Sequence, residues 1–371
     1  MACARIANFQ GLLGVKHFFK MAEKQNALVI LSPGFPENED DSTCLPAHQV
    51  FVRALNRNFP DLKVVILALQ YPFVSNEYTW HGNRVISFNG GRHRKIGRLL
   101  FWGKVWAVLN ILHKENALIG LLGFWFNEYA LVGKYFGKVH YIKHYSWITG
   151  QDAKMGNLYV KLVKPKPGSL IAMSDFLARQ FYTNYKVKPA FVVPNGIDID
   201  MFGSENLPRC IDVFAAGSLI PLKRYDDFVD VVNLIVEKLP NVQAVLCGKG
   251  PEENSLAGKI AILGLEENIQ LAGERKHHEV LGLMQQSKVF LHTSNYEGFS
   301  TVCLEALYAG AHVVSFFRPM EKDIEKWHIV QTKQEMANKA LEILFDSTTE
   351  YKPVLAYSMD GVVKQIMHLY L

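Results

Sequence analysis

Two glutamates, Glu297 and Glu305, lie eight residues apart on either side of Gly298. The apolar run at residues 289–293 predicts a strand before Gly298, and the residues after it have the spacing of a helix. Thr301 and Glu305 are four residues apart, so they share one face of this predicted helix. The segment therefore predicts a strand, a turn and a helix, with one carboxylate on each side of the helix start.

The first residues of the predicted helix, Phe299, Ser300 and Thr301, carry amide N–H groups that have no partner within the helix. A helix start of this kind binds anions. We therefore expect a phosphate on these amides, while Glu297 and Glu305 accept hydrogen bonds from hydroxyl groups on either side of it. A sugar nucleotide has this pattern, because its diphosphate lies between a sugar and a ribose.

A second segment, Gly217–Arg224, carries two cations after a predicted strand at residues 212–216. Cleavage of a sugar–diphosphate bond builds negative charge on the leaving oxygen. A fixed cation at that oxygen stabilises the transition state more than the ground state, which accelerates the reaction. Lys223 is the candidate for this role, and Arg224 is a candidate second cation.

The string E-G-F-S-x-x-x-L-E-A-L-x-x-G, which begins at Glu297, resembles the E-x7-E signature of the retaining glycosyltransferases of family 4. The resemblance is close over residues 169–320 and loose over residues 27–168. The string P-N-G-I-D at residues 194–198 resembles the interdomain linker of that family. The resemblance implies the GT-B fold of the α/β class, in which two Rossmann-like doubly wound domains face a cleft and a C-terminal helix crosses back to the first domain.

The resemblance also implies an activity. This activity is transfer of a sugar from a nucleotide-diphosphate sugar to a glycan, a lipid-linked acceptor or a small molecule, with retention of the anomeric configuration. It belongs to the synthesis of cell-surface polysaccharide or glycolipid, and it needs no metal and no cofactor besides the donor. The D-x-D string at residues 198–200 falls in the predicted linker, so we do not expect it to bind a metal.

The same resemblance suggests a role for each site residue. Lys223 and the helix amides would hold the diphosphate, Glu297 the transferred sugar and Glu305 the ribose. Backbone near Arg275 would contact the base. The donor-side residues expected in this way are Gly217, Ser218, Arg224, Gly248, Arg275, Gly298, Phe299, Ser300, Thr301 and Glu305, and the acceptor-side residues are Gly34 and Thr149.

Three site positions depart from the family pattern, and one of them is Arg224, which stands where the family has a glycine. Ser218 stands where the family has an arginine, and Thr149 stands where it has a histidine near the donor sugar. These departures keep two alternatives open, namely a non-catalytic relative that binds sugar nucleotides and a sugar-nucleotide epimerase of similar architecture. The intact Lys223, Glu297 and Glu305 favour the transferase.

Alternating apolar runs and helical patterns predict two parallel doubly wound sheets. We expect a first domain at residues 21–195, a donor-binding domain at residues 196–351 and a crossover helix at residues 352–371. Strands are predicted at residues 27–31, 63–69, 117–125, 139–145, 169–174, 212–216, 242–247, 268–272, 289–293 and 312–316. Ligands of such sheets bind at the carboxyl ends of the strands.

Charge is divided unevenly along the 371 residues. Residues 1–195 carry 24 lysines and arginines against 11 acidic residues, a net charge of +13, whereas residues 196–371 carry 16 against 24, a net charge of −8. The basic half suggests an anionic partner such as a membrane surface. Residues 92–106 have the pattern of a basic amphipathic helix, which can lie on a membrane or pack on a sheet with its basic face in solvent. No nucleic-acid-binding module is visible.

The five scattered cysteines contain no C-x-x-C pair and indicate a reducing compartment. No apolar run is long enough to cross a membrane, and residues 1–20 lack the pattern of a cleaved signal peptide. We therefore expect a cytoplasmic protein that can contact the inner face of the membrane.

Overall fold

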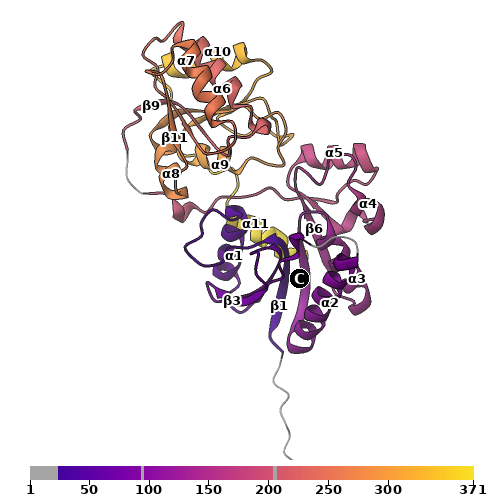
Figure 1. Ribbon diagram of the computed structural model, residues 1–371. Helices are drawn as coiled ribbons and strands as arrows, with labels where there is room; N and C mark the ends of the chain where they lie inside the picture. The colour runs from indigo at the N-terminus through magenta and orange to yellow at the C-terminus, as the bar shows by residue number, and fades with distance from the viewer. Residues whose placement is uncertain (1–23, 93–95, 204–206) are drawn as a thin grey trace, which may run out of the picture.

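The computed structural model describes residues 24–92, 96–203 and 207–371, which form two α/β lobes (Figure 1). The first lobe contains an eight-stranded sheet of order β3-β4-β2-β1-β5-β6-β7-β8, and the second contains a six-stranded sheet of order β11-β10-β9-β12-β13-β14. Neighbouring strands are parallel except for β3 and β4. In each sheet the carboxyl ends of the parallel strands therefore lie at one edge.

The strands of the first lobe are β1 (Asn26–Gly34), β2 (Lys63–Tyr71), β3 (Asn76–Trp80), β4 (Asn83–Ser87), β5 (Ala117–Phe124), β6 (His144–Ile148), β7 (Leu170–Ala172) and β8 (Phe191–Val192). Its helices are α1 (Pro46–Asn58), α2 (Ile96–Glu115), α3 (Glu128–His140), α4 (Leu158–Val163) and α5 (Asp175–Tyr185).

The strands of the second lobe are β9 (Ile211–Ala216), β10 (Ala244–Cys247), β11 (Ile269–Gly273), β12 (Ser287–His292), β13 (His312–Ser315) and β14 (Trp327–Ile329). Its helices are α6 (Tyr225–Val236), α7 (Glu253–Leu263), α8 (His277–Gln285), α9 (Thr301–Tyr308) and α10 (Lys333–Phe345).

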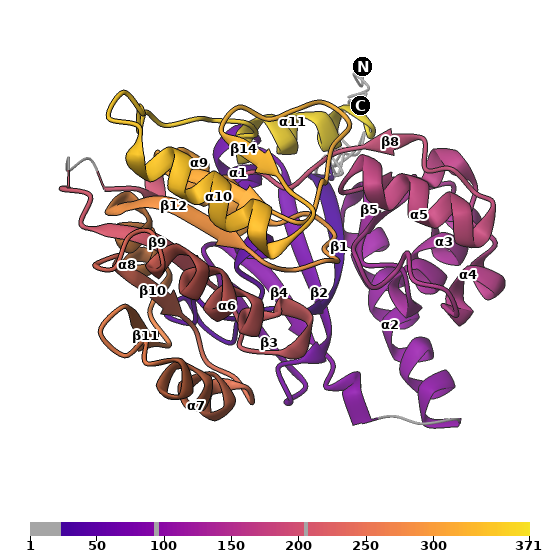
Figure 2. The same ribbon diagram turned by 90° about the horizontal axis from the view of Figure 1, so that it is seen from above.

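Strand β1 shows why the apolar runs form parallel strands. Leu28 and Ile30 are fully buried in a core that includes α1 and α11 (Met359–His368), whereas Val29 and Leu31 are fully buried in a second core that includes α2 and α3. Helices therefore cover both faces of the sheet (Figure 2). A strand buried on both faces is stabilised by a continuous apolar run rather than by an alternating one.

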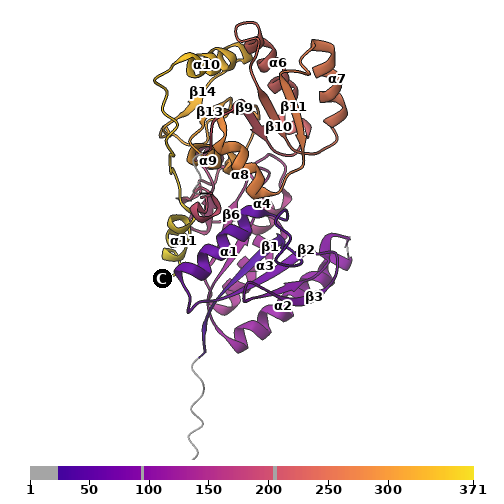
Figure 3. The same cartoon turned by 90° about the vertical axis from the view of Figure 1, so that its left-hand side faces the viewer.

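The chain crosses between the lobes twice. After the second lobe it returns to the first, where α11 lies beside α1 (Figure 3). The Tyr370 hydroxyl donates a hydrogen bond of 2.8 Å to the Leu121 carbonyl in the first sheet. The two crossing segments also touch each other, because the Met359 amide donates to the Ile197 carbonyl at 2.8 Å. This helix confirms the predicted C-terminal crossover.

Arg57 on α1 joins both crossing segments to the first lobe. Its guanidinium lies 3.3 Å from the Asp198 carboxylate in the linker and 2.7 Å from the Asp360 carboxylate on α11. The first aspartate of the D-x-D string is thus held by an arginine. This ion-pair cluster fixes the linker and the return segment against the same helix.

The predicted strand at residues 139–145 is wrong. Helix α3 runs to His140 and ends at Tyr141, whose left-handed φ of 58° stops it, and β6 begins only at His144. The Asn127 side chain begins this helix by accepting a hydrogen bond from the Tyr129 amide at 3.1 Å. Apolar and polar residues alternate in V-H-Y-I-K-H-Y, as they do in a strand. The cap at Asn127 and the packing of α3 on the sheet nevertheless make its first residues helical.

The hairpin of β3 and β4 was not predicted. His81 and Gly82 connect its strands with φ values of 42° and 77°. Two residues with positive φ form the tight turn that matches the twist of a hairpin.

Three residues of the predicted basic helix, at positions 93–95, lie outside the described residues. Within the described residues, no helix is long and apolar enough to cross a membrane.

Candidate functional site

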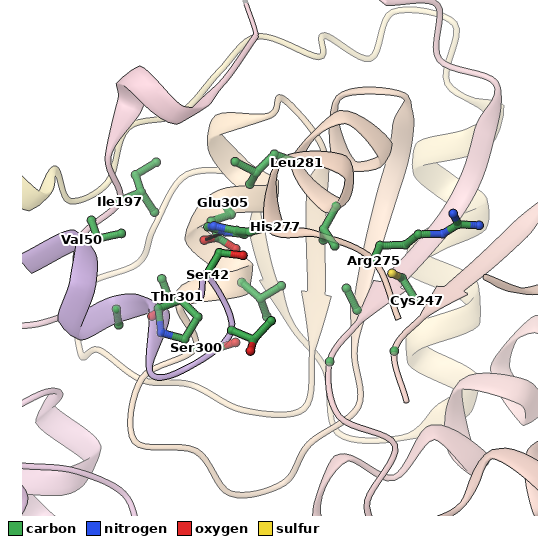
Figure 4. Close-up of a pocket in the computed structure, with 18 of the residues that line it drawn as sticks. Ser42, Val50, Ile197, Cys247, Arg275, His277, Leu281, Ser300, Thr301 and Glu305 are labelled. Carbon is green, nitrogen blue, oxygen red and sulfur yellow. Dashed lines mark hydrogen bonds and ion pairs between the residues drawn. The ribbon is translucent and has the colours of Figure 1, made fainter. Parts of the chain in front are cut away.

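A cavity of about 500 Å³ lies where the two lobes meet (Figure 4). The first lobe contributes Ser42, Thr43 and the start of α1, and the linker contributes Gly196–Asp198. The loops after β9, β10, β11 and β12 contribute the remaining wall, so the cavity lies at the carboxyl edge of the second sheet. Doubly wound sheets bind ligands at this edge.

Lys223 and Glu297 form an ion pair within this cavity. Lys223 ends a short turn after β9, and its backbone carbonyl accepts a hydrogen bond of 2.7 Å from the Thr293 hydroxyl at the end of β12. The side chains of Lys223 and Glu297 are 22% and 16% exposed, so a ligand can still reach both. The pair therefore offers a cation and an anion side by side at the cavity wall.

The charge of Glu297 is set by its two basic neighbours. Burial alone would raise its pKa, but His292 and the Lys223 ammonium outweigh burial and lower the pKa to about 2. The His292 Nε2 atom lies 3.6 Å from the Glu297 carboxylate. Burial lowers the pKa of His292 itself. Glu297 is consequently a carboxylate throughout the physiological pH range.

Glu305 lies one helical turn after Thr301 on α9 and pairs with His277, the first residue of α8. Its carboxylate lies 2.8 Å from the His277 Nε2 atom, and both residues line the cavity (Figure 4). Burial alone would lower the pKa of His277, but the hydrogen bond to Glu305 outweighs burial and raises it. The two glutamates of the motif are therefore both held by basic side chains, each from a different neighbouring element.

The start of α9 is open toward the cavity. Among the described residues, none accepts a backbone hydrogen bond from the amides of Phe299, Ser300 or Thr301, and all three residues line the cavity. The Thr301 hydroxyl accepts a hydrogen bond of 3.2 Å from Asn195 in the linker. These amides lie between Glu297 and Glu305, where an anion would meet the positive end of the helix.

Close backbone approaches fix the loops around the cavity. Gly217 and Gly248 have φ values of 151° and 156°, and a Cβ atom on Gly248 would lie 1.9 Å from the Gly217 carbonyl oxygen. Across the lobes, a Cβ atom on Gly298 would lie 2.8 Å from the Gly150 amide nitrogen. The Ser174 hydroxyl also donates to the Gly298 carbonyl at 2.7 Å. The turn before α9 is thus held directly against the first lobe.

Residues 202–357 match the family model for glycosyl transferases group 1. The match covers the second lobe and the segment that leads back to α11.

Three known proteins show how far the similarity extends. The chain is 21% identical over 254 residues to the poly(ribitol-phosphate) alpha-N-acetylglucosaminyltransferase of Staphylococcus aureus (strain COL), which covers 63% of this chain and 50% of that protein. It is 24% identical over 315 residues to the phosphatidyl-myo-inositol mannosyltransferase of Mycobacterium tuberculosis (strain ATCC 25618 / H37Rv). This alignment covers 77% of this chain and 78% of that protein. The structure of Anabaena Alr3699/HepE in complex with UDP-glucose matches with a TM-score of 0.62 and 17% identity over 93% of this chain and 97% of that one.

The chain spans 50% of the length of the first of these relatives and 26–34% of three other curated relatives that it matches over shorter stretches. The structural similarity confirms the predicted GT-B fold, with two Rossmann-like lobes and a cavity at their junction. The segment that matches the family model supplies most of the cavity wall.

Most of the predicted donor-side residues meet in the cavity. Its lining includes Gly217, Ser218, Lys223, Gly248, Arg275, Glu297, Phe299, Ser300, Thr301 and Glu305. The Arg275 side chain extends away from the Glu305 and His277 pair (Figure 4), and its Nε atom donates to the Ala272 carbonyl at 3.1 Å.

Four predicted site residues lie outside the lining. Arg224 has a left-handed φ of 53° at the start of α6, and its guanidinium lies 2.6 Å from the Asp227 carboxylate. Gly298 lies in the turn before α9 and packs against Gly150 of the first lobe. On the acceptor side, Gly34 packs against Tyr71 in the first sheet. Thr149 donates backbone and side-chain hydrogen bonds to the buried Asp152 carboxylate at 2.8 and 3.1 Å.

Sequence reasoning did not identify His277, His292 or Ser42 as site residues. A histidine at the start of a helix or at the end of a strand does not by itself form a sequence motif. Only the packing of α8 beside α9 brings His277 to Glu305. Among the described residues, the one acidic cluster close enough to share a metal ion is Asp226, Asp227 and Asp230 on α6. These carboxylates lie outside the cavity, and those of Asp227 and Asp230 are paired with basic side chains.

Proposed function

We propose that this chain is a retaining glycosyltransferase that transfers a sugar from a nucleotide-diphosphate sugar to a glycan, lipid-linked or small-molecule acceptor. The observation that carries the proposal is the arrangement of Lys223, Glu297 and Glu305 around one cavity, with the open amides of α9 between the two glutamates. A diphosphate would lie on these amides and on the Lys223 ammonium. The sugar and the ribose would then extend toward Glu297 and Glu305 respectively.

The reaction breaks the bond between the anomeric carbon and a phosphate oxygen, and the bonding electrons remain on that oxygen. Lys223 and the helix amides stabilise the negative charge that develops there. Glu297, held ionised by its lowered pKa, accepts hydrogen bonds from sugar hydroxyls and stabilises positive charge at the anomeric carbon. The acceptor hydroxyl forms the new bond to the anomeric carbon, and its proton passes to the phosphate oxygen that leaves. Retention of configuration is what the family resemblance implies.

The named relatives suggest the first donors to test. Alr3699/HepE was solved with UDP-glucose, and the two curated relatives are named for transfer of N-acetylglucosamine and of mannose. Their names also include a polymeric and a lipid acceptor. A panel of radiolabelled UDP- and GDP-sugars should therefore give transfer or slow hydrolysis with one donor. Binding without turnover would support the non-catalytic alternative, and interconversion of the sugar without an acceptor would support an epimerase.

Two substitutions separate the proposed roles. Glu305→Ala should raise the Kd for the donor, because it removes the acceptor of the ribose hydroxyl bonds. Lys223→Ala should mainly lower kcat, because its ammonium acts on charge that develops in the transition state. Glu266→Ala, at an exposed position of the second lobe, is the control. Equal donor affinity in the wild type and Glu305→Ala would remove the ribose assignment.

We further propose a cytoplasmic protein that contacts anionic membrane through a surface of exposed lysines and apolar side chains on α3, α4 and the residues that follow α4. This surface comprises Tyr135, Leu162, Lys138, Lys164 and Lys166, all of them exposed. The Tyr135 hydroxyl donates to the Leu162 carbonyl at 3.4 Å, so the two helices present one surface. Apolar side chains beside lysines favour a membrane that carries negative charge.

Vesicle sedimentation tests this contact. The wild type should sediment with vesicles that contain phosphatidylglycerol and should remain in solution with pure phosphatidylcholine. A Lys138→Glu, Lys164→Glu double variant should lose this binding, whereas Lys322→Glu in the second lobe should retain it. Equal sedimentation of the two variants would refute the assignment of the surface.

A further inference from the structure

We propose that His277 is a positioning residue, which holds the Glu305 carboxylate in the orientation that a ribose requires. The inference rests on the proposed function, in which Glu305 accepts hydrogen bonds from the ribose of the donor. It adds a histidine from a second helix to the nucleotide end of the site. The donor class follows from this chemistry, since only a nucleotide with free ribose hydroxyls would benefit from the pair.

The geometry of the pair is fixed by two helices. The His277 Nε2 atom lies 2.8 Å from Glu305, and the side chains of His277 and Glu305 are only 20% and 13% exposed. His277 is the first residue of α8, and the start of this helix is anchored because the Glu279 carboxylate accepts a hydrogen bond of 2.8 Å from the Lys276 amide. The backbone of His277 is therefore fixed at the start of α8, and its imidazole pairs with Glu305 on α9.

Positioning matters because a glutamate carboxylate is carried on three rotatable bonds. Fixing such a side chain when a ligand binds costs conformational entropy, and a side chain that is already fixed avoids this cost. A carboxylate has about four lone-pair positions for hydrogen bonds, of which His277 occupies one. The remaining positions stay open toward the cavity that both residues line.

The charged groups around His277 keep it a hydrogen-bond donor. Glu305 faces it from α9 and raises its pKa, while burial and the Arg53 guanidinium on α1 act in the opposite direction. On α8 itself, His278 and Glu279 are exposed to solvent. Because the net effect raises the pKa, the protonated ring is present to higher pH than that of a free histidine. The neutral ring with its proton on Nε2 would preserve the same hydrogen bond.

The first experiment needs no nucleotide. Proton titration of the histidine rings followed by NMR should give His277 a pKa above the ordinary value for histidine. Glu305→Gln should lower the pKa of His277, because it removes the carboxylate that pairs with the ring. An unchanged pKa of His277 in Glu305→Gln would show that the two side chains do not pair in solution, and it would overturn the inference.

The second experiment measures binding of UDP, or of GDP if the wild type prefers it, by isothermal titration calorimetry. His277→Ala should weaken binding about fivefold, as expected for the loss of one pre-ordered side chain. His278→Ala is the matched control and should bind as the wild type does. His277→Gln, which retains a side-chain N–H donor, should recover part of the affinity.

The 2′,3′-dideoxy form of the same nucleotide distinguishes positioning from general packing. Since this ligand lacks the ribose hydroxyls, His277→Ala and the wild type should bind it equally. An equal loss of affinity for both ligands, or no loss for either, would overturn the inference and leave the proposed function intact. A wild-type protein that binds neither UDP nor GDP would overturn the proposed function together with this inference.

Discussion

Glu297→Gln should destabilise the protein by an amount that depends on pH. The pKa of Glu297 is about 2, against an ordinary value of 4.5, because Lys223 and His292 together outweigh its burial. A shift of about 2.5 units at 1.36 kcal/mol per unit corresponds to roughly 3 kcal/mol at neutral pH. A carboxyl group with a lowered pKa contributes this stability above its unfolded pKa and loses it as the pH falls toward its folded pKa.

Glu297→Gln should therefore destabilise the protein by the full amount at pH 7 and by about half that amount near pH 3. Below pH 2 the variant and the wild type should be equally stable. Urea unfolding at pH 7, 5 and 3, followed by circular dichroism, measures the difference between wild type and variant. Glu266→Gln, at an exposed position, gives the effect of removing one acidic charge. If Glu297→Gln is equally destabilising at pH 7 and pH 3, or no more destabilising than the control, then Lys223 and His292 do not hold the charge of Glu297.

Two further predictions concern the backbone and the junction of the lobes. Gly248→Ala should lower the free energy of unfolding by more than about 2 kcal/mol, because the new Cβ atom would meet the Gly217 carbonyl. The control is Gly258→Ala, on α7 with free space around it. In the same urea experiment this variant should be neutral or mildly stabilising. Arg57→Met should increase the radius of gyration measured by X-ray scattering, because it releases the return segment at Asp360, and an unchanged radius would show that the ion pair does not restrain the lobes.

Much of the candidate site could be predicted because its signals are local. The strand, turn and helix around Glu297 and Glu305 follow from a few residues whose spacing fixes the start of α9. The pairing of Lys223 with Glu297 required one more step, since β9 and β12 must be neighbours in the sheet. The resemblance to a known family supplied that topology, which residue spacing alone does not contain.

The errors arose where distant packing decides the conformation. The segment at residues 139–145 has an alternating pattern, but its first residues belong to α3, whose Asn127 cap lies twelve residues earlier than Val139. Arg224 follows Lys223 directly, yet its left-handed backbone turns the side chain to Asp227 on α6. His277 meets Glu305 only because α8 packs beside α9.

The positions of the two glutamates also imply that lobe motion affects the two ends of a donor differently. Glu305, His277 and the open helix amides belong to the second lobe, so a nucleotide would keep these contacts when the lobes separate. The turn at Gly298, in contrast, contacts Gly150 in the first lobe and directly follows Glu297. Separation of the lobes would therefore disturb the sugar end first. Substitutions at the junction should for this reason lower kcat more than they weaken nucleotide binding.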